Sequence, residues 1–146
     1  MAHIKDIYLK QQRNRDLFSC YQEALKQHTF KTQRNAVDYV RVCKAPRFYI
    51  SAHSAAEYIN DLIAGRFIGN VNASSLRRIN EIYKRYKELR SQDAYKNASV
   101  ISICREIVLQ PAPEFYIGYD LASKVICREL KCHNNRMAKY ARKLSK

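Results

Sequence analysis

The residues best suited to chemistry in this sequence are the cations near its C-terminal end. Positions 121–146 hold eight Lys and Arg residues and one acid, Glu129. Each phosphate that Lys or Arg neutralises releases counterions, so a cluster of this kind is suited to a phosphate backbone. Part of the cluster recurs at steps of three or four residues, which places it on one face of a helix: Arg128, Lys131, Asn135, Lys139 and Arg142.

A second group of cations lies between Arg77 and Arg90, where six basic residues accompany two acids. The chain as a whole has 27 Lys and Arg against 13 Asp and Glu, a net charge of +14. A charge of this size on 146 residues favours a polyanionic partner. The predicted nucleic-acid contacts are Arg77, Arg78, Lys84, Arg85, Arg128, Lys131, Arg136, Lys139, Arg142 and Lys143.

Each cluster also has a plainer interpretation. The 77–90 segment fits the solvated outer face of an amphipathic helix. The C-terminal cluster fits a frayed tail that adds only electrostatic attraction. Neither pattern distinguishes sequence-specific from nonspecific binding.

Patterns typical of catalysis are missing from the sequence. It has no phosphate-cradling glycine loop, no HExxH, no nucleophile elbow and no carboxylate cluster suited to two metals. Cys127, Cys132 and His133 lack the second close ligand pair that structural zinc needs. Many of the 11 tyrosines lie on apolar stripes, where side-chain packing explains them better than a nucleophilic role. We predict a protein that is not an enzyme, with no catalytic residue, no metal site and no cofactor.

The cysteines and the hydropathy of the sequence indicate the cellular location of the protein. No stretch approaches the roughly 20 apolar residues of a membrane span, and the polar segment after Met1 is unlike a signal peptide. Five widely spaced cysteines favour a reducing compartment without disulfides. We expect a cytoplasmic protein, virion-associated if phage-encoded, with no membrane partner. Cys43 and Cys104 fall in corresponding apolar segments and are predicted to be buried, unpaired and metal-free.

An internal repeat indicates how the cations are positioned. Ala45–Ser51 (APRFYIS) returns 67 residues later as Ala112–Gly118 (APEFYIG). The apolar pattern is kept while exposed charges change sign, which is typical of two copies of one packing unit. We therefore expect the two segments to lie close together about an approximate twofold axis, with Phe48 and Phe115 buried.

Helical periodicity and few chain breakers predict an all-α protein, since the sequence has only three glycines and three prolines. Six helices are expected, over about 6–27, 32–45, 52–64, 74–90 and 95–109, and from 120 into the tail. They are predicted to form two tandem three-helix repeat units, about 6–65 and 74–130, which share a core. The whole chain, 1–146, is then a single domain with a basic helical tail, 131–146. The Phe-Tyr-Ile runs fit either a minimal two-stranded β-ribbon or extended loops that plug the core.

The doubled Ala-Pro-x-Phe-Tyr-Ile motif, each copy followed by a short Ala-containing helix, resembles a group of small bacterial and phage- or mobile-element-associated proteins. The likeness spans about 36–130 and rests on the two seven-residue segments. It implies a DNA-transaction or virion-associated role. No activity is assigned to that group, so the resemblance transfers no functional residue.

The predicted function is a non-enzymatic nucleic-acid-binding protein, with DNA favoured over RNA, that contacts the phosphate backbone through its basic helices. The alternative is a structural or adaptor protein, such as a virion or mobile-element component, whose basic surface binds an acidic partner. A helix-turn-helix reader entered through Tyr49–Ser51 is a weaker interpretation, because the connector from Lys44 is longer than the usual turn. A small enzyme whose site has no recognisable motif is weaker still. The oligomeric state is left open.

Overall fold

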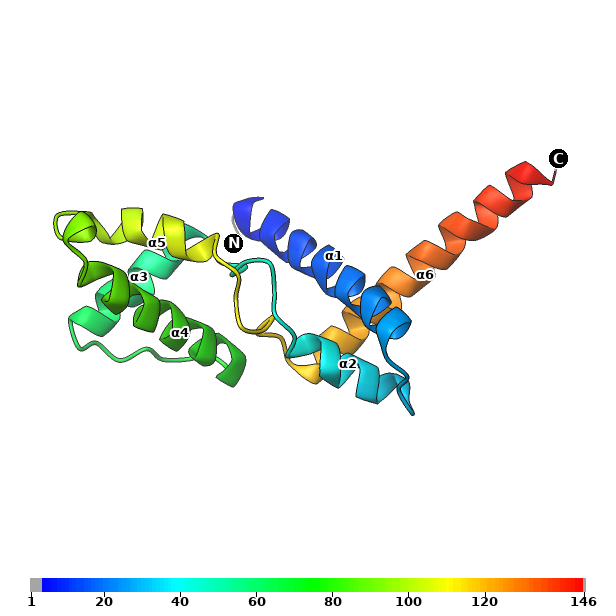
Figure 1. Ribbon diagram of the computed structural model, residues 1–146, viewed down its shortest axis with the longest axis horizontal. Coiled ribbons are helices and arrows are strands. Elements are labelled where there is room, and N and C mark those ends of the chain that lie inside the picture. Colours follow the sequence, from blue (N-terminus) through cyan, green and yellow to red (C-terminus); the bar gives the residue numbers. More distant parts are fainter. Residues whose placement is uncertain (1–3, 146) are drawn as a thin grey trace.

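The chain is almost entirely helical in the computed structural model, which describes residues 4–145 (Figure 1). A short 3-10 helix, Asp93–Tyr95, precedes the fifth α-helix. Within the described residues there is no strand, so the predicted all-α class is confirmed. The α-helices, in chain order, are α1 (Ile4–Gln27), α2 (Gln33–Arg41), α3 (Ala52–Ile63), α4 (Ala73–Arg90), α5 (Val100–Val108) and α6 (Tyr119–Leu144).

Local sequence sets where most of these helices begin. Thr32, Ser51, Asn72 and Ser99 each precede a helix, and each side chain accepts a hydrogen bond from the backbone N–H three residues later. This satisfies one of the N–H groups that a helix leaves unpaired at its start. Gly65, with φ of 71°, ends α3 in the left-handed conformation that glycine adopts without strain.

The start of α5 differs from the predicted start near residue 95. Arg90, at the end of α4, donates from Nη1 to the carbonyl oxygens of Tyr95 and Ala98, at 3.1 and 2.6 Å. These carbonyls are held by the guanidinium, and Ser99 then caps the helix that begins at Val100. A tertiary contact therefore delays a helix that periodicity alone places several residues earlier.

The helices associate in two groups that do not follow chain order. One group contains α1, α2 and α6, and the other contains α3, α4 and α5. Figure 1 shows them at opposite ends of an elongated molecule. The sequence predicts tandem units of consecutive helices, whereas here α3 packs against α4 and α5, and α6 packs against α1 and α2. The predicted tandem arrangement is therefore wrong. The connectors before α3 and α6 cross, so that α3 packs with the helices of the second half and α6 with those of the first.

The two connectors meet at the crossing point. Ala45 and Ala112 exchange both backbone hydrogen bonds at 2.9 Å and form one isolated antiparallel bridge. Pairing stops there, so the described residues contain no two-stranded ribbon. Of the two interpretations that the sequence left open for these segments, extended loops that fill the core fit better.

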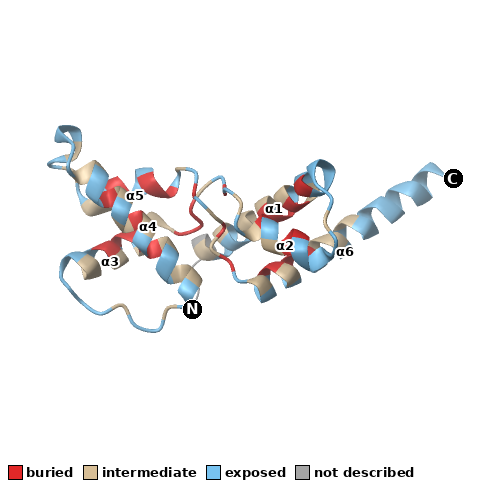
Figure 2. Ribbon diagram, turned by 60° about the horizontal axis from the view of Figure 1, so that its bottom comes forward, coloured by how far each residue is buried: buried red, intermediate tan, exposed pale blue. Residues whose placement is uncertain are grey.

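Aromatic side chains of the crossing segments join the two helix groups into one hydrophobic core. Phe48 is fully buried and stacks on Tyr116, with ring centroids 6.0 Å apart. Phe115 is 3% exposed and stacks on Tyr49 at 6.1 Å. The expected closeness of the two segments and the burial of both phenylalanines are confirmed. Figure 2 shows buried backbone running through this crossing as well as along the inner helix faces.

The two cysteines predicted to be buried differ. Cys104 lies inside α5 and is fully buried. Cys43 is half-exposed, because α2 ends at Arg41 and leaves it on the connector, where its thiol donates to the carbonyl oxygen of Tyr39 at 3.2 Å. The prediction of burial is correct for Cys104 and wrong for Cys43.

Thiol labelling should follow this difference. Burial raises the pKa of the Cys104 thiol to about 11, so at pH 8 it is protonated as well as inaccessible. In the native protein, alkylation at pH 8 followed by mass spectrometry should modify exposed Cys127 and Cys132 first and Cys104 only on unfolding. Modification of Cys104 as fast as Cys127 would contradict the position of α5 in the core.

Candidate nucleic-acid interface

The C-terminal part of α6 extends away from both helix groups (Figure 1). Every residue from Asn134 to Ser145 is exposed, and Figure 2 shows this part of the helix in the colour of exposed residues. It continues for about 16 Å beyond the core at 1.5 Å per residue. Arg142 and Lys143 in its last turn lie where the helix dipole favours positive charge. All the predicted contact residues of α6 are exposed: Arg128, Lys131, Arg136, Lys139, Arg142 and Lys143.

Two stripes run along this half of α6. His133 lies against Phe18 of α1, with ring centroids 6.1 Å apart, which fixes the face of α6 turned toward the body. Side chains at steps of three or four residues continue the same face outward: Leu130, His133, Met137, Tyr140 and Leu144. Arg128 is two residues from Leu130, so the stripe of cations that it begins lies on the opposite face. The helix therefore presents its cations to solvent.

The arginines of α4 have other partners. Arg77 pairs with Glu114 at 2.9 Å. Arg85 pairs with Glu81 at 3.2 Å, donates to the carbonyl oxygen of Pro111 at 2.9 Å and lies over the Phe48 ring. These contacts hold the crossing connectors against α4. Arg85 is half-buried by these contacts, whereas Arg77, despite its ion pair, and Lys84 are exposed.

The two predicted clusters do not form one surface. The α4 group belongs to the helices α3, α4 and α5, whereas α6 belongs to the opposite group and extends away from them (Figure 1). The predicted contact residues of α4 and α6 therefore lie on different parts of the molecule. The candidate interface is the cationic face of α6 alone.

Arg78 differs from its neighbours on α4. It is half-buried, and its Nη1 donates to the carbonyl oxygen of Tyr49 at 3.3 Å. Its Nε is enclosed and has no hydrogen-bond partner among the described residues. Burial lowers the pKa of Arg78, because the charged form loses solvation.

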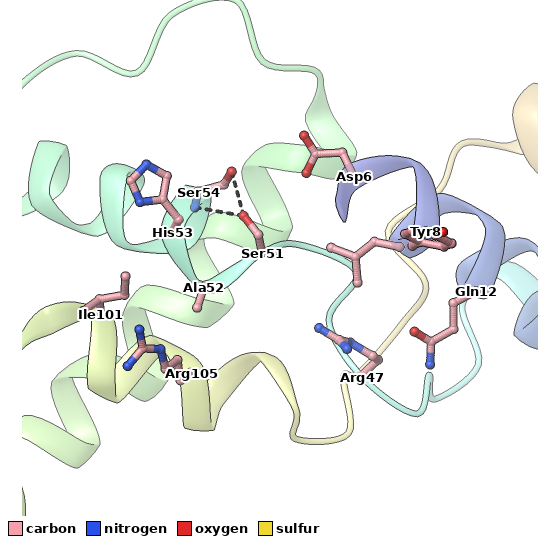
Figure 3. Close-up of a pocket in the computed structure, with 11 residues that line it drawn as sticks. Asp6, Tyr8, Gln12, Arg47, Ser51, Ala52, His53, Ser54, Ile101 and Arg105 are labelled. Carbon is pink, nitrogen blue, oxygen red and sulfur yellow. Dashed lines mark hydrogen bonds between the residues drawn. The ribbon is translucent and has the colours of Figure 1, made fainter. Parts of the chain in front are cut away.

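Sequence reasoning missed three arginines that line hollows beside the first half of α1. Arg47 and Arg105 line a groove of about 850 Å³ between α1, α5 and the start of α3. Figure 3 shows both side chains in this groove, together with Tyr8 and Gln12 of α1. Arg13 lines a smaller neighbouring cavity with Arg78. These cations are single residues on separate elements, so no local cluster marks them; only the crossing of the connectors brings them together.

Potential metal ligands are scattered over the molecule. Nowhere in the described part of the chain do three or more His, Cys, Asp or Glu side chains gather as a metal site would require. Cys127 and Cys132 are exposed on α6. None of the helices in residues 4–145 combines the length and apolar character needed to cross a bilayer.

Comparison with known proteins gives no match. A scan against protein-family models, a search of curated proteins and a search of solved structures each found nothing similar to this chain. Its function is therefore inferred from its own residues.

Proposed function

We propose that this protein binds nucleic acid, without catalysis, through the cationic face of α6. The observation that carries the proposal is the exposure of a helix whose cations share one face, with no acid after Glu129. A helix held clear of the body can approach a phosphate backbone without steric hindrance from the rest of the chain. Exposed Asn134 and Asn135 add hydrogen-bonding groups beside the cations.

DNA is the proposed partner in preference to RNA. An α-helix with its side chains is about 10–12 Å across, which fits the roughly 12 Å major groove of B-DNA. The major groove of an A-form RNA duplex is too narrow and deep for a helix to enter. Cations along one face of α6 would then meet phosphates at the edges of the groove.

Filter binding of the intact protein tests this preference. Duplex DNA and duplex RNA of equal length are compared across a salt series, and we expect tighter binding and a steeper salt slope with DNA. Equal affinity and slope for both duplexes would remove the groove argument and leave only charge attraction. No binding to either at low salt would contradict nucleic-acid binding altogether.

A second candidate function is supported by the other face of the same helix. Met137, Tyr140 and Leu144 are 55%, 60% and 69% exposed and form an apolar stripe without a partner among residues 4–145. Such a stripe favours the structural or adaptor alternative, in which an amphipathic helix binds a protein with a complementary groove and acidic rim. Such a protein would be a virion or mobile-element component. We propose the cytoplasm, a reducing compartment, as its location.

The two halves of the chain are proposed to be copies of one unit that have exchanged their third helices. Paired contacts support this. Tyr49 donates to Asp16 at 2.6 Å. Burial, together with the charge of Glu81, raises the pKa of the corresponding Tyr116 to about 12. The Phe48–Tyr116 and Phe115–Tyr49 stacks are related by the same 67-residue offset as the sequence repeat.

A further inference from the structure

A cavity of about 240 Å³ lies between α1, α3, α4 and the segment at Tyr49. Three cations line it, Lys10, Arg13 and Arg78, together with one carboxylate, that of Asp6. It also receives the side chain of Ser54, near the N-terminus of α3. The cavity therefore has an excess of positive charge.

Two of these cations occupy matching positions. Arg13 lies four residues before Leu17 in α1, and Arg78 lies four residues before Ile82 in α4. Leu17 and Ile82 are both buried in the core, at 0% and 1% exposure. The crossing of the two halves thus places one arginine from each at the same cavity, where two like charges face each other.

Neither arginine has a carboxylate partner among the described residues. Arg13 donates from Nε and Nη2 to the side-chain oxygen of its neighbour Asn14, at 3.3 and 3.1 Å. Arg78 has only the carbonyl oxygen of Tyr49, and its Nε is enclosed and unpaired. By contrast, Arg77 and Arg85 on the same helix form ion pairs with Glu114 and Glu81.

This arrangement is unfavourable while the cavity holds only solvent. Each of these half-buried charges loses part of its solvation without a counter-ion to replace it, and the enclosed Nε–H of Arg78 adds the cost of an unpaired donor. Burial lowers the pKa of Arg13, and the charge of Arg78 lowers it further, which is the direction expected for two desolvated cations in proximity. An anion between them would reverse both effects.

We propose that this cavity is a binding site for a phosphoryl group, held between the guanidiniums of Arg13 and Arg78. Planar guanidinium forks match phosphate oxygens, and two such forks, those of Arg13 and Arg78, line this cavity without a carboxylate partner. The Ser54 hydroxyl accepts from Ser51, so its own hydrogen is free to donate. Lys10 adds a third positive charge.

The space around the cavity fits a phosphoryl group carried on a larger molecule. One water molecule needs about 10–15 Å³ of such space, so a volume of about 240 Å³ leaves room for a phosphate. The 850 Å³ groove shares Asp6, Leu9 and Ser54 with this cavity, so the two adjoin. Figure 3 shows that groove open between α1 and α5, with Arg47 and Arg105 in its lining.

Thermal unfolding of the full chain tests the site. Sodium phosphate is added at pH 7 from 0 to about 10 millimolar, with ionic strength held constant by sodium chloride, a range below that in which phosphate acts by exclusion from the protein surface. Binding to the folded state alone raises Tm with concentration. We expect this rise in the wild type and its loss in Arg13→Gln and in Arg78→Gln.

Arg77→Gln is the matched control. It removes the same charge from the adjacent residue of α4, whose guanidinium pairs with Glu114 outside the cavity, and it should keep the phosphate-dependent rise in Tm. Arg78→Gln should fold at least as well as the wild type without phosphate, because it removes an unpaired charge. No rise in the wild type, or an equal rise in both cavity variants, would overturn the proposal.

The arginine Nε–H resonance of Arg78 in an NMR spectrum gives a second readout that needs no variant to fold. It should shift with sodium phosphate in the wild type, and no shift would overturn the proposal. A short single-stranded oligonucleotide added in place of sodium phosphate shows whether the site accepts a phosphoryl group of a nucleic acid or only that of a small ligand. A shift with both probes assigns the site to nucleic-acid backbone, whereas a shift with phosphate alone assigns it to a small phosphorylated ligand.

This result is independent of the function proposed for α6. A protein with the α6 cations neutralised should keep its phosphate-dependent rise in Tm, because none of them lines the cavity. If the wild type does not bind DNA but keeps its phosphate response, the function proposed for α6 is wrong and the phosphoryl site still stands.

Discussion

Replacing four exposed cations of α6 by Gln, in the variant R128Q/K131Q/K139Q/R142Q, is expected to reduce sharply the salt dependence of binding to duplex DNA. Each phosphate contact contributes about 0.9 to the slope of log affinity against log salt, so four full contacts contribute about 3.6. Because this counterion contribution vanishes near 1 M salt, affinity at 0.1 M should fall by up to about 3.6 orders of magnitude. The fold should be kept, since all four side chains are exposed and Gln is a good helix former.

A charge-matched control separates α6 from net charge. The variant K26Q/K31Q/K87Q/K96Q removes four exposed cations from other parts of the chain. Binding is measured for both variants by fluorescence anisotropy with one labelled duplex from 50 to 300 millimolar salt. If the control lowers the slope as much as the α6 variant does, the chain acts through its overall charge, and the proposed interface is wrong.

Truncation gives an independent form of the same test, provided the cut respects the core. Leu130 packs against the hydrophobic cluster and His133 against Phe18, so a cut directly after Leu130 would disturb α1. A cut after Asn134 leaves these contacts in place and removes five cations: Arg136, Lys139, Arg142, Lys143 and Lys146. Circular dichroism should then show loss of the last helical turns only, with Tm nearly unchanged, while the salt slope falls.

Phe48→Ala should destabilise the whole molecule by about 3–5 kcal/mol of unfolding free energy, the usual cost of deleting a buried phenyl ring. Phe48 is fully buried, stacks on Tyr116 and lies under the guanidinium of Arg85 at 4.9 Å. Few atoms can move into the space, because segments of both helix groups surround it. Phe115→Ala should have a similar effect, since that ring is 3% exposed and stacks on Tyr49.

Urea unfolding followed by circular dichroism measures these changes, and Phe67→Ala is the control. Phe67 is 93% exposed on the connector between α3 and α4, so its loss should change stability by less than about 0.5 kcal/mol. Because the crossing segments belong to one core, the wild type should unfold in a single transition. Two separate transitions, with only one affected by Phe48→Ala, would show that the helix groups fold independently.

Much of the fold follows from local sequence. Apolar spacing and the small number of glycines and prolines predict the six helices, because the side-chain contacts within a helix are between residues three and four apart. Capping side chains set most starts for the same reason, as Ser51 does for α3. The stripe of cations on α6 is also local, since positions 128–142 share a face of one continuous helix whatever surrounds it. Local periodicity therefore suffices to predict the proposed interface.

The sequence alone did not indicate which helices associate. Each third helix carries an apolar stripe, but a stripe does not specify which helices it packs against, so periodicity cannot tell a tandem unit from an exchanged one. The crossing at Ala45 and Ala112 decides it, through backbone hydrogen bonds between residues 67 positions apart.

That crossing also decides what the individual arginines do. It brings Glu114 to Arg77 and Pro111 to Arg85, so these two predicted nucleic-acid contacts also make contacts within the fold. It brings Arg13 and Arg78 to one cavity, although nothing near either residue in the sequence marks it. A charge's role depends on the solvent and counter-ions around it, and these are set by residues distant in the chain. The sequence determines how many cations the protein has and which helices carry them, while tertiary structure alone decides which of them remain available to a partner.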